Sequence, residues 1–266
     1  MTGVDLRSLD AQQTADIRAA WLSHQVIYFP DQPLDHSELA QFSLTIGPFG
    51  EDPYVAPIAG HNHIIEIRRE PDEKVSPFGA AWHSDWSFQA TPPSATLLQA
   101  MIVPPVGGDT LYADGYAAYE TLSTSEQSEL AQMTALHSAK RPYSPQGFYA
   151  SGGPDRSMKI LPDESANAVQ EHPLIRTHPE TGRRVLWINP VYTIGIRDMA
   201  ETEAAILLKR LFDHATSERF IYRHRWAADM LTLWDNRSVQ HAAQGGYDGH
   251  RRVMYRTTVQ GDTPYL

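Results

Sequence analysis

The sequence predicts a mainly β protein with flanking helices, in the form of a barrel or jelly roll and not of a doubly wound α/β sheet. Two observations favour this class: short apolar runs of strand length recur along the chain, and the helical patterns lie at the periphery of this series. No internal repeat, low-complexity tract or linker interrupts the 266 residues, and all-β barrels of this length are commonly one domain. We therefore expect a single domain over residues 1–266.

Two helices are predicted in the N-terminal part of the chain. Residues 10–22 carry Trp21 and other apolar side chains at helical spacing. Asp35 and Glu38 have the spacing of a capping box, and Gly47 is a typical residue to end a helix. A second helix is therefore expected between Asp35 and Gly47.

Six apolar runs bounded by Gly, Pro, Asn and Asp predict the strands. They are QVIYF (25–29), HIIEI (63–67), ATLLQAMIV (95–103), RVLWI (184–188), DMLTLW (229–234) and RRVMYRTTV (251–259).

Two more helices are expected among these strands. Ser123 and Glu126 repeat the capping-box spacing. Residues 201–214 place apolar side chains on one side of a helix, namely Ala205, Leu208, Leu211 and Phe212. The helices therefore flank a set of strands that should form the core.

Composition excludes several classes of function. A formal charge of -10 argues against broad binding of a phosphate backbone, so nucleic acid is not an expected partner. No segment has the length and apolarity of a membrane span, and the N-terminus lacks the pattern of a secretory signal. Without cysteine there is neither a disulfide framework nor a thiolate metal site. We expect a cytoplasmic location and no membrane partner.

The stretch AAWHSDWSF (80–88) places His83 and Asp85 two residues apart in an aromatic-rich segment that reads as a buried strand. In a strand these two side chains would share one face, with Ser84 and Trp86 on the other. Buried ionisable groups need hydrogen bonds, a charged partner or a metal. Taken alone the motif is too short to be specific, and a solvated strand end explains it more simply.

His241 supplies a candidate third ligand, because a barrel brings strands that are remote in sequence side by side. It follows the buried run 230–234 and a predicted turn at Asp235 and Asn236. Two histidines and one carboxylate leave half of an octahedral shell open, as in non-heme Fe(II) oxygenases, whereas zinc hydrolases more usually use tetrahedral sites. The ligand types leave the metal open.

Two arginines follow the third ligand candidate. Arg252, Met254 and Arg256 share one face of the last predicted strand. An inward arginine is costly without an anion, and its planar guanidinium suits a carboxylate in two-point contact. This pattern predicts an acidic small molecule beside the metal. The alternative is that both arginines lie on an exposed face or pair with the chain's own carboxylates.

Two long blocks carry a resemblance to a known family. WHSDWSFQATPPSATLLQAMIVPPVGGDTLYAD and WDNRSVQHAAQGGYDGHRRVMYRTTVQGD resemble the TauD/TfdA family of taurine and 2,4-dichlorophenoxyacetate dioxygenases, and the likeness runs from HQVIYFPDQPLDHSELAQFSLTIGPFG to the C-terminus. The resemblance implies a double-stranded β-helix, which is a cupin-like jelly roll with flanking helices. It also implies Fe(II) as cofactor, with 2-oxoglutarate and O2 as co-substrates.

The resemblance also assigns expected roles to residues near the metal. His83, Asp85 and His241 match the iron ligands of the family. Arg252 and Thr110 match the residues that hold the distal carboxylate of 2-oxoglutarate. Arg252 and Thr110 would then mainly orient the co-substrate.

The substrate side is assigned in the same way. Arg256 matches the arginine that holds the anionic group of the primary substrate, and Tyr192 falls where the family places a pocket aromatic residue. Taurine enzymes have a sulfonate-binding histidine in the region that here contains Asp52 and Tyr54, and no histidine aligns there. Tyr54 and the bulky Trp86 are therefore expected to shape the pocket, and taurine is not the expected substrate.

The resemblance thus implies an enzyme that hydroxylates a small organic anion and releases succinate and CO2. The anion would be a sulfonate, a sulfate ester, an aryloxy acid or another carboxylate, and a homodimer or homotetramer is expected by analogy. Two alternatives stay open from the residues: a metal-dependent hydrolase with the same triad, and a non-catalytic cupin-like protein that binds a small molecule.

Overall fold

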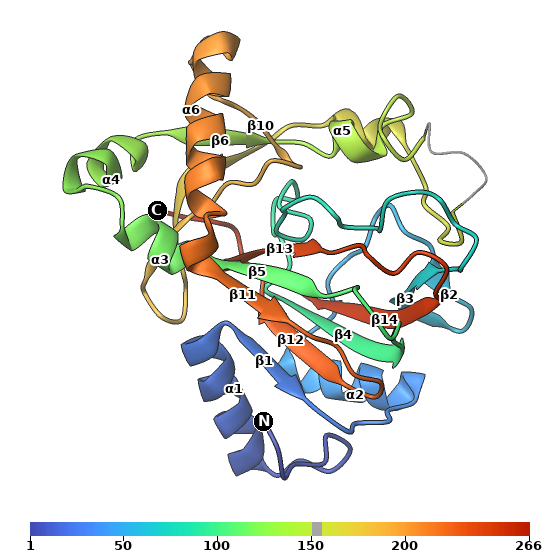
Figure 1. Ribbon diagram of the computed structural model, residues 1–266. Helices are drawn as coiled ribbons and strands as arrows, with labels where there is room; N and C mark the ends of the chain where they lie inside the picture. Colours follow the sequence, from blue (N-terminus) through green and yellow to red (C-terminus); the bar gives the residue numbers. More distant parts are fainter. Residues whose placement is uncertain (151–155) are drawn as a thin grey trace.

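The computed structural model describes residues 1–150 and 156–266, and two antiparallel sheets that face each other form its centre (Figure 1). The larger sheet has six strands, which in spatial order are β1 (Val26–Phe29), β12 (Leu231–Asp235), β4 (Ala95–Ile102), β14 (Arg252–Val259), β3 (His61–Arg69) and β2 (Pro57–Ile58). The smaller sheet has three, which are β11 (Ile221–His224), β5 (Thr110–Asp114) and β13 (Val239–Ala243). Except for β2 and β3, neighbouring strands in these two sheets are remote in sequence, as in a jelly roll.

The two faces of the larger sheet have different partners. Helices α1 (Ala11–His24) and α2 (His36–Ile46) cover its outer face (Figure 1), where Trp21 and Phe42 pack with Leu97 and Leu233. The inner face packs against the smaller sheet through a second cluster that contains Leu98, Ala100, Tyr112, Trp234, Val239 and Met254. Because side chains alternate along a strand, the even positions of β14 point into the space between the sheets. Arg252 and Arg256 are among them and are buried, as the shared-face prediction requires.

A third layer of helices and short strands lies beside the smaller sheet. Its strands are β6 (Thr134–His137), β7 (Gln170–Pro173) and β10 (Thr193–Ile196), with the hairpin β8 (Ile175–Thr177) and β9 (Arg184–Leu186). Its helices are α3 (Gly115–Glu120), α4 (Thr124–Leu130), α5 (Lys140–Tyr143) and α6 (Glu201–Ala215), with single 3-10 turns η1 (Glu164–Asn167) and η2 (Glu218–Phe220). Together these elements bury a separate apolar cluster around Leu174, Leu186 and Leu211.

The mainly β class with flanking helices is confirmed, and so are the predicted helix starts. Capping boxes open α1 at Asp10, α2 at Asp35 and α4 at Ser123. One detail of α6 was wrong: Ala204 is buried, whereas Ala205 is exposed. The buried stripe of α6 consists of Ala204, Leu208, Leu211 and Ala215, which recur at spacings of four and three, so Leu208 and Leu211 lie where predicted.

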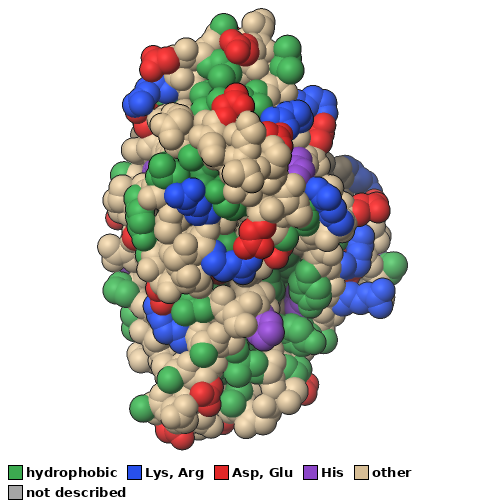
Figure 2. All heavy atoms as spheres, turned by 90° about the vertical axis from the view of Figure 1, so that its left-hand side faces the viewer, with side chains coloured by type: hydrophobic (Ala, Val, Ile, Leu, Met, Phe, Trp, Pro, Cys, Tyr) green, Lys and Arg blue, Asp and Glu red, His purple; other side chains and the backbone are tan. Residues whose placement is uncertain are grey.

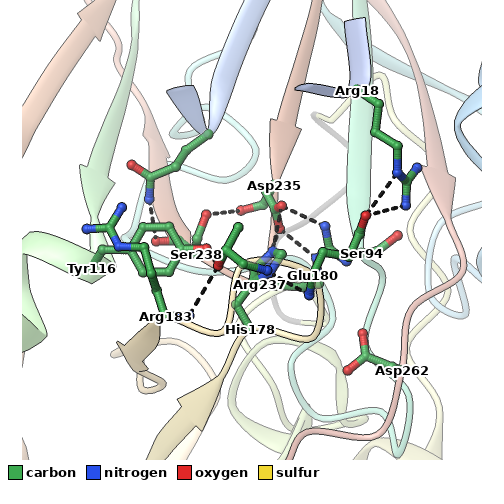
Figure 3. A network of polar contacts seen from close by, with 12 residues as sticks. Arg18, Ser94, Tyr116, His178, Glu180, Arg183, Asp235, Arg237, Ser238 and Asp262 are labelled. Atoms are coloured by element: carbon green, nitrogen blue, oxygen red, sulfur yellow. Dashed lines mark hydrogen bonds and ion pairs between the residues drawn. The ribbon is translucent and has the colours of Figure 1, made fainter. Parts of the chain in front are cut away.

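A network of charges, buried at His178, Asp235 and Arg237, joins α1 to the β8–β9 hairpin and to the turn after β12 (Figure 3). Asp235 accepts hydrogen bonds from Arg237 Nε at 2.9 Å and Nη2 at 2.7 Å, and from His178 Nε2 at 3.0 Å. His178 Nδ1 accepts two backbone N–H groups, so the ring proton lies on Nε2. Glu180 binds Arg237 at 2.7 Å and Arg18 at 2.6 Å. The network fixes the turn that leads from β12 into β13.

The surface on the side of α3 and α4 carries charges of both signs. Figure 2 shows Lys and Arg side chains on this face interspersed with Asp, Glu and hydrophobic ones. Within residues 1–150 and 156–266, every helix is too short or too polar to cross a membrane. A surface hollow of about 630 Å³ lies between α1, β1 and β11, and its lining includes neither the histidines nor the aspartate of the candidate metal site.

Candidate active site

His83, Asp85 and His241 converge between the two sheets. Their ligand atoms all lie within 4.8 Å of one another, and all three residues are buried. Asp85 Oδ1 is 3.6 Å from His83 Nε2 and 3.9 Å from His241 Nε2. Two imidazoles and one carboxylate at these separations form one face of a metal shell and leave the opposite face open.

The backbone that creates this convergence is not the predicted strand, so that prediction was wrong. His83 forms an isolated bridge with His241, through N–H groups that donate in both directions at 3.0 and 2.8 Å. Asp85 opens a turn, and Trp86 adopts a φ of +48°. The carboxylate therefore reaches the histidines because the chain turns at Asp85, and not because alternate residues of a strand share a face.

Both histidines can offer Nε2 to a metal. His83 Nδ1 donates to the carbonyl oxygen of Ala81 at 2.8 Å, which leaves the lone pair on Nε2. Burial, together with the nearby His83 ring, lowers the pKa of His241 to about 3, so its imidazole is neutral at physiological pH. Neutral imidazole is the form that ligates metals.

Asp85 is oriented by a chain of hydrogen bonds that sequence reasoning missed. Its Oδ2 accepts from Thr96 Oγ1 at 2.6 Å, Thr96 Oγ1 accepts from Asn236 Nδ2 at 2.8 Å, and Asn236 Oδ1 accepts from Trp234 Nε1 at 2.9 Å. Burial alone would raise the pKa of Asp85, but Arg256 and the two histidines outweigh it and hold that pKa well below its usual range. Only strand pairing brings Thr96 opposite Trp234, so the local sequence carried no signal for this chain.

One small cavity, of about 30 Å³, lies on the side of His241. It contains Arg252 and Thr110, and Trp226 Nε1 donates to Thr110 Oγ1 at 3.0 Å. Arg252 is 5% exposed, and it forms no ion pair with any residue in the described part of the chain. Burial lowers the pKa of Arg252 because no carboxylate offsets it. A buried guanidinium of this kind is a ready site for an anion.

A second cavity, of about 50 Å³, borders His83 and Asp85 and has an aromatic wall. The wall is made by Trp86, Tyr192 and their neighbours Phe78, Tyr143 and Tyr149. Trp86 thus faces the cavity, contrary to the strand-based expectation that it would turn away. Tyr54 does not line this cavity; its ring stacks on that of Tyr143 at 4.9 Å between centroids, one layer behind the wall.

Arg256 also borders both cavities, but its charge is already met. It pairs with Asp85 at 3.2 Å and with Asp52 through Nη2. Asp52 accepts two further hydrogen bonds, from Trp86 Nε1 at 2.7 Å and from Thr258 Oγ1 at 3.1 Å. Arg256 therefore pairs with the chain's own carboxylates, which is the alternative that the sequence left open.

Comparison with known proteins shows the family to which a chain with this site belongs. Residues 1–258 match the family described as "Taurine catabolism dioxygenase TauD, TfdA family". The chain belongs to this family. The TauD/TfdA assignment covers both sheets and every residue of the triad.

Individual relatives agree with the TauD/TfdA assignment. An (S)-phenoxypropionate/alpha-ketoglutarate-dioxygenase of Sphingobium herbicidovorans is 31% identical, over 98% of this chain and 91% of the relative. A crystal structure of a taurine dioxygenase from Burkholderia xenovorans superposes with a TM-score of 0.81 at 32% identity, covering 98% of this chain and 86% of the other. The structure of AAD-2 in complex with Mn(II) and N-oxalylglycine gives 0.79 at 27% identity, covering 100% and 96%.

This TauD/TfdA chain is a 2-oxoglutarate-dependent dioxygenase with Fe(II) as its metal. The residues present fit both groups, since the triad offers three ligand atoms on one face and Arg252 is a buried cation without a carboxylate partner. The family assignment therefore disfavours the two alternatives that the ligand types alone left open, a metal-dependent hydrolase and a non-catalytic binding protein.

Two glycine pairs of the dioxygenase shape the side of the site that holds Arg252. Gly107 and Gly108 have φ values of +68° and +73°, and Gly108 N donates to the carbonyl oxygen of Gly245 at 3.0 Å. A Cβ atom at Gly107 would lie 2.5 Å from the carbonyl oxygen of Gly246. This segment before β5 needs glycine because the loop between His241 and Arg252 packs directly on it.

Proposed function

We propose that this dioxygenase hydroxylates a small organic substrate held against its aromatic wall, with 2-oxoglutarate anchored on the opposite side of the metal. In this proposal His83, Asp85 and His241 hold Fe(II). The observation that carries it is the division of the space around the triad into two cavities, one with the unpaired Arg252 and one with the aromatic wall.

The co-substrate side rests on charge and hydrogen bonding. Arg252 offers a planar guanidinium to the distal carboxylate, and Thr110 offers a hydroxyl beside it in the same cavity. Pairing would remove the cost of a buried, unpaired cation, so it should contribute strongly to binding. The cation is fixed on β14, which limits the orientations that the co-substrate can adopt.

The substrate side rests on shape and on the relatives. Trp86 and Tyr192 would hold the reacting carbon near the open face of the metal and exclude water. A small organic molecule with an anionic group is the first class to test, because taurine carries a sulfonate and phenoxypropionate a carboxylate, and both appear in the names of relatives. Sulfonates, sulfate esters and aryloxy acids therefore belong in one screen.

The bound metal and 2-oxoglutarate would supply the oxidising chemistry, with O2 consumed and succinate and CO2 released. The protein's own contribution is positional. Thr96 holds Asp85 in one orientation, Ala81 fixes the tautomer of His83, and the aromatic wall limits which carbon of the substrate faces the metal. Tyr54 would support that wall from behind.

A spectroscopic experiment tests the proposal. Anaerobic addition of Fe(II) and 2-oxoglutarate should give a weak visible metal-to-ligand charge-transfer band. His83→Ala should abolish the band, whereas the exposed His24→Ala should leave it unchanged. Absence of the band in folded wild-type protein contradicts the proposal.

A substrate screen scored by succinate formation tests the reaction itself. Substrate-dependent succinate release with an equal amount of hydroxylated product supports hydroxylation, and succinate without a modified substrate contradicts it. A cytoplasmic location, a single domain over residues 1–266 and a homodimer or homotetramer stay predictions from the sequence.

A further inference from the structure

We infer that Asp52 closes the Arg256 side of the substrate cavity to anions, so that the group which the substrate presents to this wall carries no negative charge. The inference rests on the proposed function, because it concerns the substrate of the same site. It makes Asp52 a specificity-determining residue, which is a role that the sequence did not suggest.

The first observation is that Asp52 occupies the position an anion would take on Arg256. The two side chains are only 8% and 3% exposed, and they come from segments 204 residues apart. Asp52 accepts hydrogen bonds from three donors: the guanidinium, the Trp86 indole and the Thr258 hydroxyl. An ionised carboxylate takes only a few good donors, so this internal ligand is well satisfied.

The second observation concerns the buried charge that would remain if an anion displaced Asp52 from Arg256. A sulfonate or carboxylate that replaced Asp52 on Arg256 would leave the Asp52 carboxylate largely buried, next to a second negative charge and without its cation. Breaking a buried pair in this way is strongly unfavourable, while a neutral group requires no such exchange. The guanidinium stacks at 5.1 Å on the Trp86 ring and contacts Asp85, so it is also held in place and cannot turn toward a second anion.

The third observation is the balance of charge around the metal. With Fe(II) and a dianionic 2-oxoglutarate bound, their charges and those of Arg252, Arg256, Asp85 and Asp52 would sum to zero. The immediate site would therefore be neutral before any substrate arrives. Because interactions between charges are strong in a buried site, an added anion would meet no net positive charge there.

The cavity continues outward in a form that suits an apolar or aromatic group. An outer cavity of about 350 Å³ shares Ala80, Ala81, Pro142, Tyr149 and Val191 with the inner one. Its lining is mostly apolar, and Arg141 lies exposed at its edge. The apolar skeleton of a substrate would therefore lie in the outer cavity, with an uncharged polar group against Arg256.

Matched pairs of ligands test the inference. Alkyl and aryl sulfonates are compared with the primary sulfonamides of the same skeletons, which have nearly the same shape without the charge. Binding is read anaerobically, with Fe(II) and 2-oxoglutarate present, from the change in the charge-transfer band and from the shift in the melting temperature. In the wild-type protein the sulfonamides should bind at least roughly tenfold more tightly.

Asp52→Asn keeps the shape and removes the charge, so it should shift the preference toward the sulfonate by at least roughly tenfold. Glu51→Gln makes the same charge change one residue away on an exposed side chain, and it should leave the preference unchanged. A wild-type preference for sulfonates, weak binding of both kinds, or an Asp52→Asn variant with the wild-type preference would each overturn the inference.

The outcomes separate this inference from the proposed function. A missing charge-transfer band in wild-type protein contradicts the proposed function, whereas a normal band with tight sulfonate binding overturns only the role of Asp52. Should Asp52→Asn fail to fold, the wild-type comparison of the matched ligands still decides whether anions are disfavoured.

Discussion

Arg252 and Arg256 show at the residue scale how neighbours decide what a side chain can do. Both lie on the inner face of β14 and both are buried, yet Arg252 has no ion pair among the described residues and Arg256 has two. The reason is their neighbours: Arg256 lies beside Asp85 and Asp52, whereas Arg252 lies near the ring of Tyr247. One arginine is thus available to bind a ligand, and the other is committed within the chain.

Replacement of Arg252 should mainly weaken the binding of the co-substrate. Arg252→Ala would remove the proposed two-point contact with the distal carboxylate. Such a contact is worth about 2 to 5 kcal/mol, so half-saturation should need roughly a hundredfold more 2-oxoglutarate. Titration of the charge-transfer band measures this. Arg251→Ala is the matched control, because Arg251 is exposed and pairs with Glu70 at 3.2 Å. Equal weakening in both variants would contradict the role of Arg252.

Gly79 offers a second test beside the metal. It has a φ of +73°, and an added Cβ atom would lie 3.2 Å from His83 Cε1. Gly79→Ala should therefore weaken metal binding by roughly tenfold as the imidazole is displaced. Gly60→Ala controls for backbone strain, since Gly60 has a φ of +82° and nothing within 4 Å of the added atom. Metal titration should separate the two variants, and equal affinities would contradict the crowding of His83.

At the scale of elements, the site is a property of β14 and of what supports it from both sides. Its inner face carries Arg252 and Arg256, and its outer face packs against α2, where Thr257 Oγ1 and Ser43 Oγ are 2.7 Å apart. Helix α2 is fixed at its start by the Asp35 capping box. The helix therefore contributes to the stability of the sheet without touching the space in which ligands would bind.

This separation predicts that stability and co-substrate binding can be changed independently. Asp35→Ala removes the N-cap of α2 and should lower the free energy of unfolding by about 1 kcal/mol, with unchanged affinity for 2-oxoglutarate. Asp35→Asn should be nearly neutral, because asparagine caps helices equally well. Urea denaturation and titration of the charge-transfer band measure the two quantities. A large loss of 2-oxoglutarate affinity in Asp35→Ala would show that the two faces are coupled.

At the scale of the whole molecule, three buried histidines outside the site link stability to pH. Burial lowers the pKa of His137 to about 3, and those of His172 and His224 to about 4. In the unfolded chain these groups titrate near 6.5. Below that pH the unfolded chain takes up protons that the native protein does not, so the stabilising contribution is complete above about pH 6.5 and is lost as the pH falls toward 4.

Each such histidine should give a slope of roughly 1.4 kcal/mol in unfolding free energy per pH unit between its two pKa values. Urea denaturation at several pH values from 5 to 6.5 measures the slope. His172→Gln should reduce the slope by about 1.4 kcal/mol per pH unit, the contribution of one proton. The same change at the exposed His24, His24→Gln, should leave the slope unchanged. An unchanged slope in His172→Gln would contradict the assignment.

The sequence by itself determined the features that depend on neighbours a few positions apart. Capping boxes at Asp35 and Ser123, the strand runs and the shared face of Arg252 and Arg256 all follow from local periodicity, which one segment carries alone. His83, Asp85 and His241 were assigned as ligands through the resemblance of two long sequence blocks to the TauD/TfdA family, because the spacing of His83 and Asp85 alone is too short to be specific.

Tertiary structure alone decided the contacts between segments that are distant in sequence. The bridge between His83 and His241, the turn that brings Asp85 to them, and the pairing of Asp52 with Arg256 depend on how the sheets are packed. Local propensity contains no information on such pairings, because the same residues could meet different partners in another packing. For that reason the sequence predicted which residues form the metal site, while the charge of the substrate wall emerged only when Asp52 was found against Arg256.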